Sequence, residues 1–274
     1  IVLPESGWTN YPITVLRRMS RNFGELQGAD IAFISDLPQA AGLSSSSAFM
    51  ISIFLSIATR NNLFSSRLYK SNINTDLDLA AYLGTIENGQ NYGVLLGDRG
   101  VGTFGGSEDH TAIICSSPNK LSQFAYCPAR LEKQIELSSE FVFVLGFSGV
   151  TAEKTGTARA QYNRAALQVA SLVDIWQRST GGKENYLADI LRSTSDAHGR
   201  LIRAVSESNH SKFSEPELLT RLQHFIIEDQ EIIDPASNAL GSGDICSFGA
   251  IVDRSQKDGA DILGNQIPET ISLA

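Results

Sequence analysis

The chain has few of the residues on which several common architectures depend. Its three cysteines, Cys115, Cys127 and Cys246, are odd in number and far apart in 274 residues, which excludes a disulfide framework and a zinc knuckle. Lysine and arginine form no block, and 30 acidic against 22 basic side chains give a net charge of −8. We therefore expect no nucleic-acid partner and no acidic membrane partner, since both need clustered positive charge.

Long apolar runs and the usual cysteine or histidine motifs are missing as well. The most apolar stretch, residues 48–58, is interrupted by Ser52 and Ser56 and is far shorter than the ~20 residues that span a bilayer. No G-x-x-x-x-G-K-[ST] occurs, which excludes a P-loop enzyme, and neither H-x-x-x-H nor C-x-x-C is present. What remains is a soluble globular protein of a reducing compartment, and we expect it in the cytoplasm.

The hydrophobic pattern predicts a mixed α/β first half and a mainly helical second half, with a boundary near residue 147. The length suits two domains. The predicted strands cover 29–35, 123–127 and 141–146. The predicted helices cover 43–60, 76–88, 151–179, 186–191, 197–205, 215–240 (interrupted near Pro235) and 244–263.

Glycine is concentrated between residues 89 and 106, which predicts a long functional loop. Residues 100–105 match the dinucleotide pattern G-x-G-x-x-G, but neither a buried strand before them nor a long helix after them is predicted. We therefore reject a dinucleotide site. Gly-Ser-Gly at 241–243 could be a further phosphate loop, although a turn between two helices is the simpler interpretation.

A run of four serines gives the sharpest chemical signal. Residues 38–48 read Pro-Gln-Ala-Ala-Gly-Leu-Ser-Ser-Ser-Ser-Ala and open the predicted helix 43–60. Hydroxyls and unpaired backbone N–H groups meet at such a helix start, and the helix dipole adds partial positive charge, so an anion can bind there. Serine is also a favoured N-cap residue. Capping uses only one serine, and on local grounds phosphate binding and simple capping both stay open.

This segment resembles the central phosphate-binding motif of the GHMP kinases, the superfamily of galactokinase, homoserine kinase and mevalonate kinase. Other stretches resemble the galactokinase branch in particular, so the similarity extends over nearly the whole chain. These stretches are Trp-Thr-Asn-Tyr at 8–11, Phe-Gly-Gly-Ser-Glu-Asp-His at 104–110, Ser-Gly at 148–149, Tyr-Asn at 162–163, Phe-Gly at 248–249 and Pro-Glu-Thr at 268–270.

The resemblance implies an α+β, two-domain fold of the GHMP-kinase type. Residues 1–146 would form the nucleotide-binding domain, similar to the ribosomal protein S5 domain 2 fold, and residues 147–274 a mainly helical, ferredoxin-like domain. The family's first motif, near P-G-R-x-N-x-I-G-E-H, and its last glycine-rich motif are missing. We therefore expect the chain to be the interior of a longer kinase that lacks the first strands and the last motif, and not to turn over by itself.

The resemblance also implies a site for ATP and Mg²⁺. Phosphoryl transfer needs neutralised charge on the γ-phosphate, and Mg²⁺ prefers oxygen ligands, for which Ser46 and Glu87 would serve. Asp109 would be the general base or would orient the sugar hydroxyl, with Gly106, His110 and Tyr162 also at the sugar. The residues implied for the nucleotide are Gly42, Leu43, Ser44, Ser45, Ser46 and Ser47.

Several of these residues also have an ordinary interpretation. Without the family, Glu87 is a solvated helix end, Glu108–Asp109 is a polar turn, and Tyr162 is an aromatic on the buried stripe of a long helix. His110 stands where galactokinases usually have glutamine, and unlike glutamine it can carry charge near neutral pH.

Three functions follow from this resemblance. The first is an ATP-dependent galactokinase-like enzyme that phosphorylates the anomeric hydroxyl of galactose or a related sugar. The second, motivated by His110, is a uronic-acid or N-acetylhexosamine 1-kinase of the same superfamily. The third is a kinase-like sensor that binds sugar and nucleotide without catalysis. In each case the partners are a small sugar and ATP, and the protein is a monomer or a homodimer.

Overall fold

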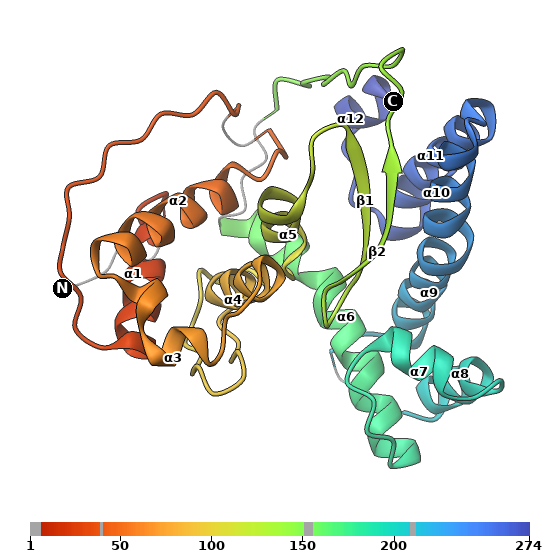
Figure 1. Cartoon of the computed structure of the whole chain (residues 1–274). Coiled ribbons are helices and arrows are strands. Elements are labelled where there is room, and N and C mark those ends of the chain that lie inside the picture. The colour runs from red at the N-terminus through yellow and green to blue at the C-terminus, as the bar shows by residue number, and fades with distance from the viewer. Residues whose placement is uncertain (1–6, 39–40, 151–155, 209–211) are drawn as a thin grey trace. The chain divides into compact units, whose positions relative to one another are not determined.

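The computed structural model describes residues 7–38, 41–150, 156–208 and 212–274. The chain divides into two compact units (Figure 1). The first unit comprises Ile1–Val142 and Gly149–Ala160, and the second comprises Phe143–Ser148 and Gln161–Ala274. Helices dominate both units, so the described fold is a helix-rich α+β fold with one small sheet.

The first unit is built on three helices that bury one apolar cluster. Val15 and Met19 of one helix, Met50 and Phe54 of the next, and Leu83 of a third are fully buried and form its centre. The predicted helices 43–60 and 76–88 correspond to α2 and α4 within two residues. The helical elements are α1 (Asn10–Phe23), α2 (Ser45–Arg60), the 3₁₀ turn η1 (Leu63–Ser65), α3 (Arg67–Lys70), α4 (Asp76–Asn88) and α5 (Glu108–Cys115).

Clear local signals define both ends of α4. At its start, the Thr75 hydroxyl accepts from the amide of Asp78, and the Asp78 carboxylate accepts from the amide of Thr75, which is a capping box. At its end, Gly89 takes a left-handed conformation, with φ 85°, and its amide donates to the carbonyl of Thr85. The predicted glycine-rich loop then runs without regular helix to the start of α5.

The sheet is a hairpin of β1 (Lys120–Ala125) and β2 (Arg130–Glu136), paired antiparallel with Lys120 opposite Glu136. The predicted strand 123–127 overlaps only the second half of β1, because the polar first half and the whole of β2 lack the apolar alternation on which the prediction relied. Ile135 is buried, and most other side chains of the hairpin are half-buried or exposed.

The two other predicted strands are wrong. Residues 29–35 and 141–146 are irregular, and most of their large side chains are exposed, with Ile34 at 99% and Val144 at 85%, whereas Ile31 is half-buried. Their β-branched and aromatic content favours a strand, but a strand forms only where a neighbour accepts its backbone hydrogen bonds. Within the described residues neither segment has such a neighbour, and sequence pattern alone could not show this.

In the described part of the second unit, every regular element is a helix. Trp176, Ile190, Leu201 and Leu218 come from four successive helices and meet in its core. Its elements are α6 (Gly156–Thr180, which begins in the first unit), α7 (Leu187–Ser193), α8 (Ala197–Glu207), α9 (Glu215–Ile226), the π turn η2 (Ile227–Ile232), α10 (Ile233–Ser242), α11 (Ile245–Asp258), the π turn η3 (Gly259–Leu263) and α12 (Pro268–Leu273).

The expected interruption near Pro235 takes the form of a π turn. The chain stays helical from α9 to the end of α10, but the π turn η2 ends at Ile232, three residues before Pro235. Proline lacks an N–H donor, and its ring crowds the carbonyl four residues earlier. A wider turn directly upstream relieves both effects, so the helix is altered rather than broken.

Gly-Ser-Gly at 241–243 ends α10 and begins the turn to α11, in line with its simpler interpretation: Gly241 and Ser242 close the helix and Gly243 follows it. Gly243 is left-handed, with φ 78°, and the carboxylate of Asp244 accepts from the amide of Ser247 at the start of α11. The predicted helix 244–263 corresponds to α11 with η3, and the start of the predicted helix 151–179 falls outside the described residues.

Candidate functional site

The serine run forms the amino end of α2. Ser44 is left-handed, with φ 54°, and its side chain makes no capping hydrogen bond, so the structure gives no support to simple capping by this residue. In the described part of the chain, the hydroxyls of Ser44, Ser45 and Ser46 have no hydrogen-bond partner, and all three residues are half-buried. Gly42 is exposed and also left-handed. Three polar hydroxyls thus border the positive end of an apolar helix. Gln39 and Ala40 of the motif lie outside the described residues.

Ser47, the fourth serine, brings two carboxylates to one point. Its side chain is fully buried, and its Oγ lies 3.2 Å from Oε2 of Glu87 and 3.3 Å from Oδ2 of Asp109. One hydroxyl proton can serve only one of these acceptors at a time. The sequence prediction placed Glu87 and Asp109 in the same site, and the structure brings both to the helix start, with Ser47 rather than Ser46 between them.

Glu87 occupies the last turn of α4 and is only 7% exposed, so it is not a solvated helix end. Its Oε1 accepts from the hydroxyl of Thr103 at 3.3 Å, while Oε2 faces Ser47. On the same side, Nε2 of the fully buried His110 lies 3.7 Å from Oε2, a pair that is ionic only when the imidazole is protonated. His110 therefore faces the Glu87 carboxylate.

The short turn of residues 105–107 fixes where α5 begins, and with it the position of Asp109. The side-chain amide of Asn88 donates to the carbonyl of Gly105 at 2.9 Å. Gly84 of α4 lets the turn approach closely, because a Cβ atom there would lie 2.8 Å from Ser107. On the other side, the ring of Tyr126 lies where a side chain of Gly106 would project. The predicted sugar residue Gly106 is thus held between α4 and the hairpin.

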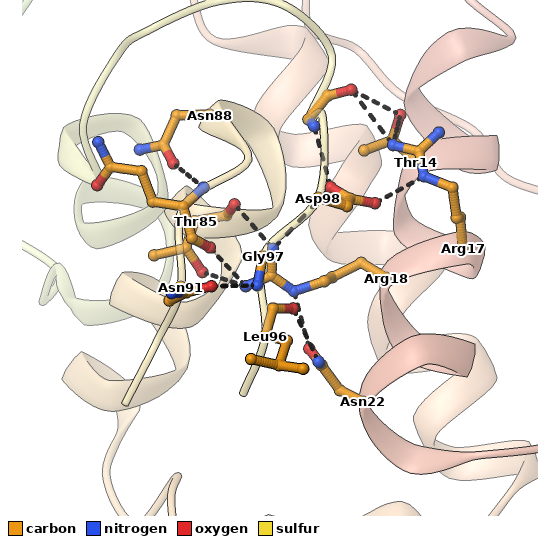
Figure 2. A network of polar contacts seen from close by, with 12 residues as sticks. Thr14, Arg17, Arg18, Asn22, Thr85, Asn88, Asn91, Leu96, Gly97 and Asp98 are labelled. Carbon is orange, nitrogen blue, oxygen red and sulfur yellow. Dashed lines mark hydrogen bonds and ion pairs between the residues drawn. The ribbon is translucent and has the colours of Figure 1, made fainter. Parts of the chain in front are cut away.

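The glycine-rich loop is tied to α1 by two arginines (Figure 2). Arg17 donates to Asp98 at 2.6 Å and to the carbonyl of Gly100 at 3.3 Å. Arg18 is fully buried and donates to the carbonyl of Gln90 at 2.7 Å and to the hydroxyl of Thr85 at 3.2 Å. Burial lowers the pKa of the Arg18 guanidinium, an effect that the nearby Tyr82 and Asp98 oppose.

Arg17 and Arg18, here called the arginine clamp, hold the loop where residues 98–101 return to its start next to Glu87. The amide of Val101 donates to the Glu87 carbonyl at 2.8 Å, and Asn10 of α1 donates to the Val101 carbonyl at 3.1 Å. Gly100 must be glycine here, because it has φ 59° and a Cβ atom would lie 2.3 Å from the carbonyl oxygen of Glu87. The loop therefore supports the helix end that carries Glu87.

Tyr162, predicted at the sugar, lies on α6 in the second unit. Its side chain is 41% exposed, so the alternative of a buried aromatic stripe does not describe it. Ser148 and Phe147 border a hollow of about 380 Å³ with residues of α12, also within the second unit. Of the three remaining histidines, His198 is exposed and His224 is buried, although their helical sequence context predicts surface positions for both; His210 lies outside the described residues.

The oxygen atoms at α2 fit Mg²⁺ better than a transition metal. In the described residues no cluster of three or more histidine, cysteine, aspartate or glutamate side chains could hold a metal ion by itself. Mg²⁺ needs fewer protein ligands, since it usually takes one or two carboxylates and completes its shell with phosphate and water. Glu87, Asp109 and the Ser47 hydroxyl between them offer such hard oxygen donors.

Sequence reasoning missed two features of this site. Thr103 touches Glu87 but falls in the G-x-G-x-x-G segment that was set aside as a false dinucleotide motif. Helix α1 was not predicted, because the buried Arg18 interrupts its apolar stripe. The high glycine content of the loop was a usable signal for both features. Glycines allow another part of the chain to pack closely against the loop backbone, which implies a neighbouring element there.

The comparisons with known proteins agree with the geometry of the first unit. Residues 10–98 match the family model described as the GHMP kinases N terminal domain. This segment contains α1, the serine run and Glu87, and ends before Thr103 and Asp109. No curated protein matches the chain.

Members of the GHMP kinase family are phosphotransferases that use ATP. The match shows that residues 10–98 are similar to the N-terminal domain of this family. Separately, no helix among the described residues is both long enough and apolar enough to cross a membrane.

Proposed function

We propose that this protein is a galactokinase-like sugar kinase that transfers the γ-phosphoryl group of ATP to the anomeric hydroxyl of galactose or a related sugar. In this proposal the first unit belongs to the nucleotide-binding domain and the second to the C-terminal domain of the family. The observation that carries it is the meeting of Glu87 and Asp109 at the Ser47 hydroxyl. Beside it, at the same helix start, lie three serine hydroxyls that bond to no group in the described part of the chain.

The amino end of α2 would hold the triphosphate. Gly42 is exposed and Leu43 is half-buried, and Ser44, Ser45 and Ser46 offer hydroxyls that no group of the described chain uses. Backbone amides of the first helical turn and the helix dipole add to the attraction for phosphate. Mg²⁺, when bound, neutralises charge on the β- and γ-phosphates. Glu87 and Ser46 would hold the ion, and Ser47 keeps Glu87 and Asp109 close together.

Asp109 would accept the proton of the attacking hydroxyl. The sugar oxygen forms a bond to the γ-phosphorus, the bond to the bridging oxygen breaks, and ADP leaves with that electron pair. The proton passes to the carboxylate of Asp109, which lies in the first turn of α5. Gly106, just before the N-cap residue Ser107 of this helix, would contact the sugar.

A uronic-acid or N-acetylhexosamine substrate is the alternative within the same superfamily. His110 motivated it, but His110 is buried and faces Glu87, so the structure offers no direct contact between its ring and a sugar. We therefore favour galactose or a close relative. A panel of sugars at equal concentration tests this preference, and faster turnover of a uronic acid would reverse it.

The decisive experiment measures ADP release by the full-length protein on addition of ATP, Mg²⁺ and galactose. Asp109→Asn keeps the shape of the side chain and removes the base, so turnover should fall by ~10²-fold or more. Glu108→Gln is the matched control, because Glu108 is the exposed neighbour on the same helix turn. Near-normal turnover by Asp109→Asn would refute the mechanism. Tight binding of ATP and galactose by the wild type without any ADP would favour the sensor instead.

A further inference from the structure

The Glu87 carboxylate is held at both of its oxygen atoms. Oε2 faces the Ser47 hydroxyl at 3.2 Å, and Oε1 accepts from the Thr103 hydroxyl at 3.3 Å. Thr103 is only 2% exposed, so this bond is shielded from water. A hydrogen bond to a charged acceptor is stronger than a neutral one, and burial strengthens it further. The plane of the carboxylate is thus set by two hydroxyls, one on each side.

We propose that Thr103 is a positioning residue that aims Glu87 at the magnesium–nucleotide complex. The inference rests on the function proposed above and deepens it. Thr103 binds Oε1, whereas Oε2 faces the serine run, so Thr103 acts through Glu87 and is not itself a ligand. Partners of this kind fix the orientation of a ligating side chain, and their loss commonly weakens metal binding 10- to 100-fold.

The backbone around Thr103 is rigid enough to serve this purpose. Two residues earlier, the amide of Val101 donates to the carbonyl of Glu87 at 2.8 Å, so the segment that carries Thr103 is bonded to the same residue that it orients. Asn10 of α1 binds the Val101 carbonyl, and the hydroxyl of Thr14 lies 3.5 Å from the carbonyl of Gly100. Each of these bonds limits the movement of Thr103 relative to Glu87.

The arginine clamp completes the support. Asp98 accepts from Arg17 at 2.6 Å and also from the amide of Gly100 at 2.9 Å (Figure 2). Side chains of α1 therefore set the course of the loop just before it delivers Thr103. None of the hydrogen bonds described above joins α1 to Glu87 directly. Helix α1 therefore contributes to the site indirectly, through the loop that carries Thr103.

The test separates the hydroxyl of Thr103 from its packing. Thr103→Val keeps the shape of the side chain and removes the donor, and Thr103→Ser keeps the donor. We expect Thr103→Val to weaken binding of Mn²⁺ in the presence of ATP, measured by electron paramagnetic resonance, by 10- to 100-fold, and Thr103→Ser to stay within about three-fold of the wild type. The KM for the magnesium–ATP complex should rise in parallel.

Thr111→Val is the matched control, because Thr111 is another buried threonine of the first unit and its hydroxyl has no hydrogen-bond partner in the described part of the chain. It should leave Mn²⁺ binding unchanged. Urea unfolding of each variant checks that the fold is intact. If Thr103→Val does not fold, Thr103→Ala and Thr103→Ser are compared instead, with the same expectation for the presence or absence of the hydroxyl.

Unchanged Mn²⁺ binding by Thr103→Val, or equal weakening by Thr103→Ser, would overturn this inference while leaving the proposed function in place. A wild-type protein that binds no Mn²⁺ with ATP and releases no ADP would overturn the proposed function and this inference together.

Discussion

Nε of Arg17 donates to Oδ2 of Asp98 across 2.6 Å, and this ion pair joins helix α1 to the middle of the glycine-rich loop. The Asp98 side chain is only 9% exposed, and its other oxygen accepts from the backbone of Gly100. Surface ion pairs contribute little, but a sheltered pair with further hydrogen bonds contributes more. The loop beneath the candidate site is therefore a structural element with its own fixed course.

Replacement of Arg18 should destabilise the first unit. Arg18→Met fills the space but leaves the Gln90 carbonyl and the Thr85 hydroxyl without their arginine donor, whereas the Asn22 oxygen still accepts from the Tyr82 hydroxyl. Unsatisfied buried groups cost ~1–3 kcal/mol each, so we expect a loss of about 3 kcal/mol in the free energy of unfolding. Arg21→Met, on the exposed side of α1, should change it by less than about 0.5 kcal/mol. Urea titration measures the free energy of unfolding of both variants. Equal losses would contradict the structural role of Arg18 in holding the loop.

Two glycines of the loop offer a matched comparison of strain and space. Gly93 and Gly100 both have positive φ, at 54° and 59°. A Cβ atom at Gly93 would have its nearest neighbour 3.9 Å away, whereas one at Gly100 would lie 2.3 Å from the Glu87 carbonyl oxygen. Gly93→Ala should therefore cost only ~1–2 kcal/mol of left-handed strain. Gly100→Ala should cost more and also raise the KM for magnesium–ATP. Similar unfolding free energies for the two variants would show that the close approach does not matter.

Removal of the Ser47 hydroxyl should leave Glu87 and Asp109 facing each other without their shared donor. We expect Ser47→Ala to lower kcat/KM for ADP release by ~10- to 100-fold, with the larger effect at low Mg²⁺. Ser52→Ala, which removes a hydroxyl that donates to a backbone carbonyl on the exposed side of the same helix, is the control and should have little effect. An equally small effect for Ser47→Ala would argue against the site.

The stability of the second unit should depend on pH through His224. Burial lowers the pKa of His224 from its ordinary value of 6.5, and the positive charge of Arg221 acts in the same direction, against Glu228 and Asp258. The unfolded chain therefore binds the proton first. The stability that comes from the neutral ring is fully present above about pH 6.5 and is lost as the pH falls toward the lower pKa of the folded state.

His224→Gln should flatten this loss in urea titrations between about pH 5 and pH 8. His198→Gln, at an exposed position of α8, should leave the slope as it is in the wild type. A slope that His224→Gln does not change would assign the pH dependence to other groups.

The sequence was informative where a local signal determines a local structure. Helix α4 ends where Gly89 supplies a left-handed residue, and α2 begins at the serine run. Residues 29–35 and 141–146 show the opposite case, because a strand depends on a partner elsewhere in the chain. Helix α1 was not predicted because the charged Arg18 lies on its buried face. Burial of Arg18 is tolerated because the Thr85 hydroxyl and the Gln90 carbonyl accept hydrogen bonds from its guanidinium.

The same distinction applies to the candidate site. Glu87 and Asp109 were predicted from a family resemblance, and the structure brings them together. The special position of Ser47 among four consecutive serines depends on which face of α2 meets α4 and α5, and residue type alone does not reveal this. Thr103 was missed for the same reason, because its hydrogen bond to Glu87 depends on how the loop folds back toward α4.

The tight joining of the two loop ends has a practical consequence for labelling. Val94 at the tip of the loop is 71% exposed, while Gly89 and Gly97 press against each other at its base. A fluorophore attached through Val94→Cys would therefore lie at an exposed loop tip whose base is held by close backbone packing. With the exposed Cys246 replaced, it reports on the tumbling of the first unit.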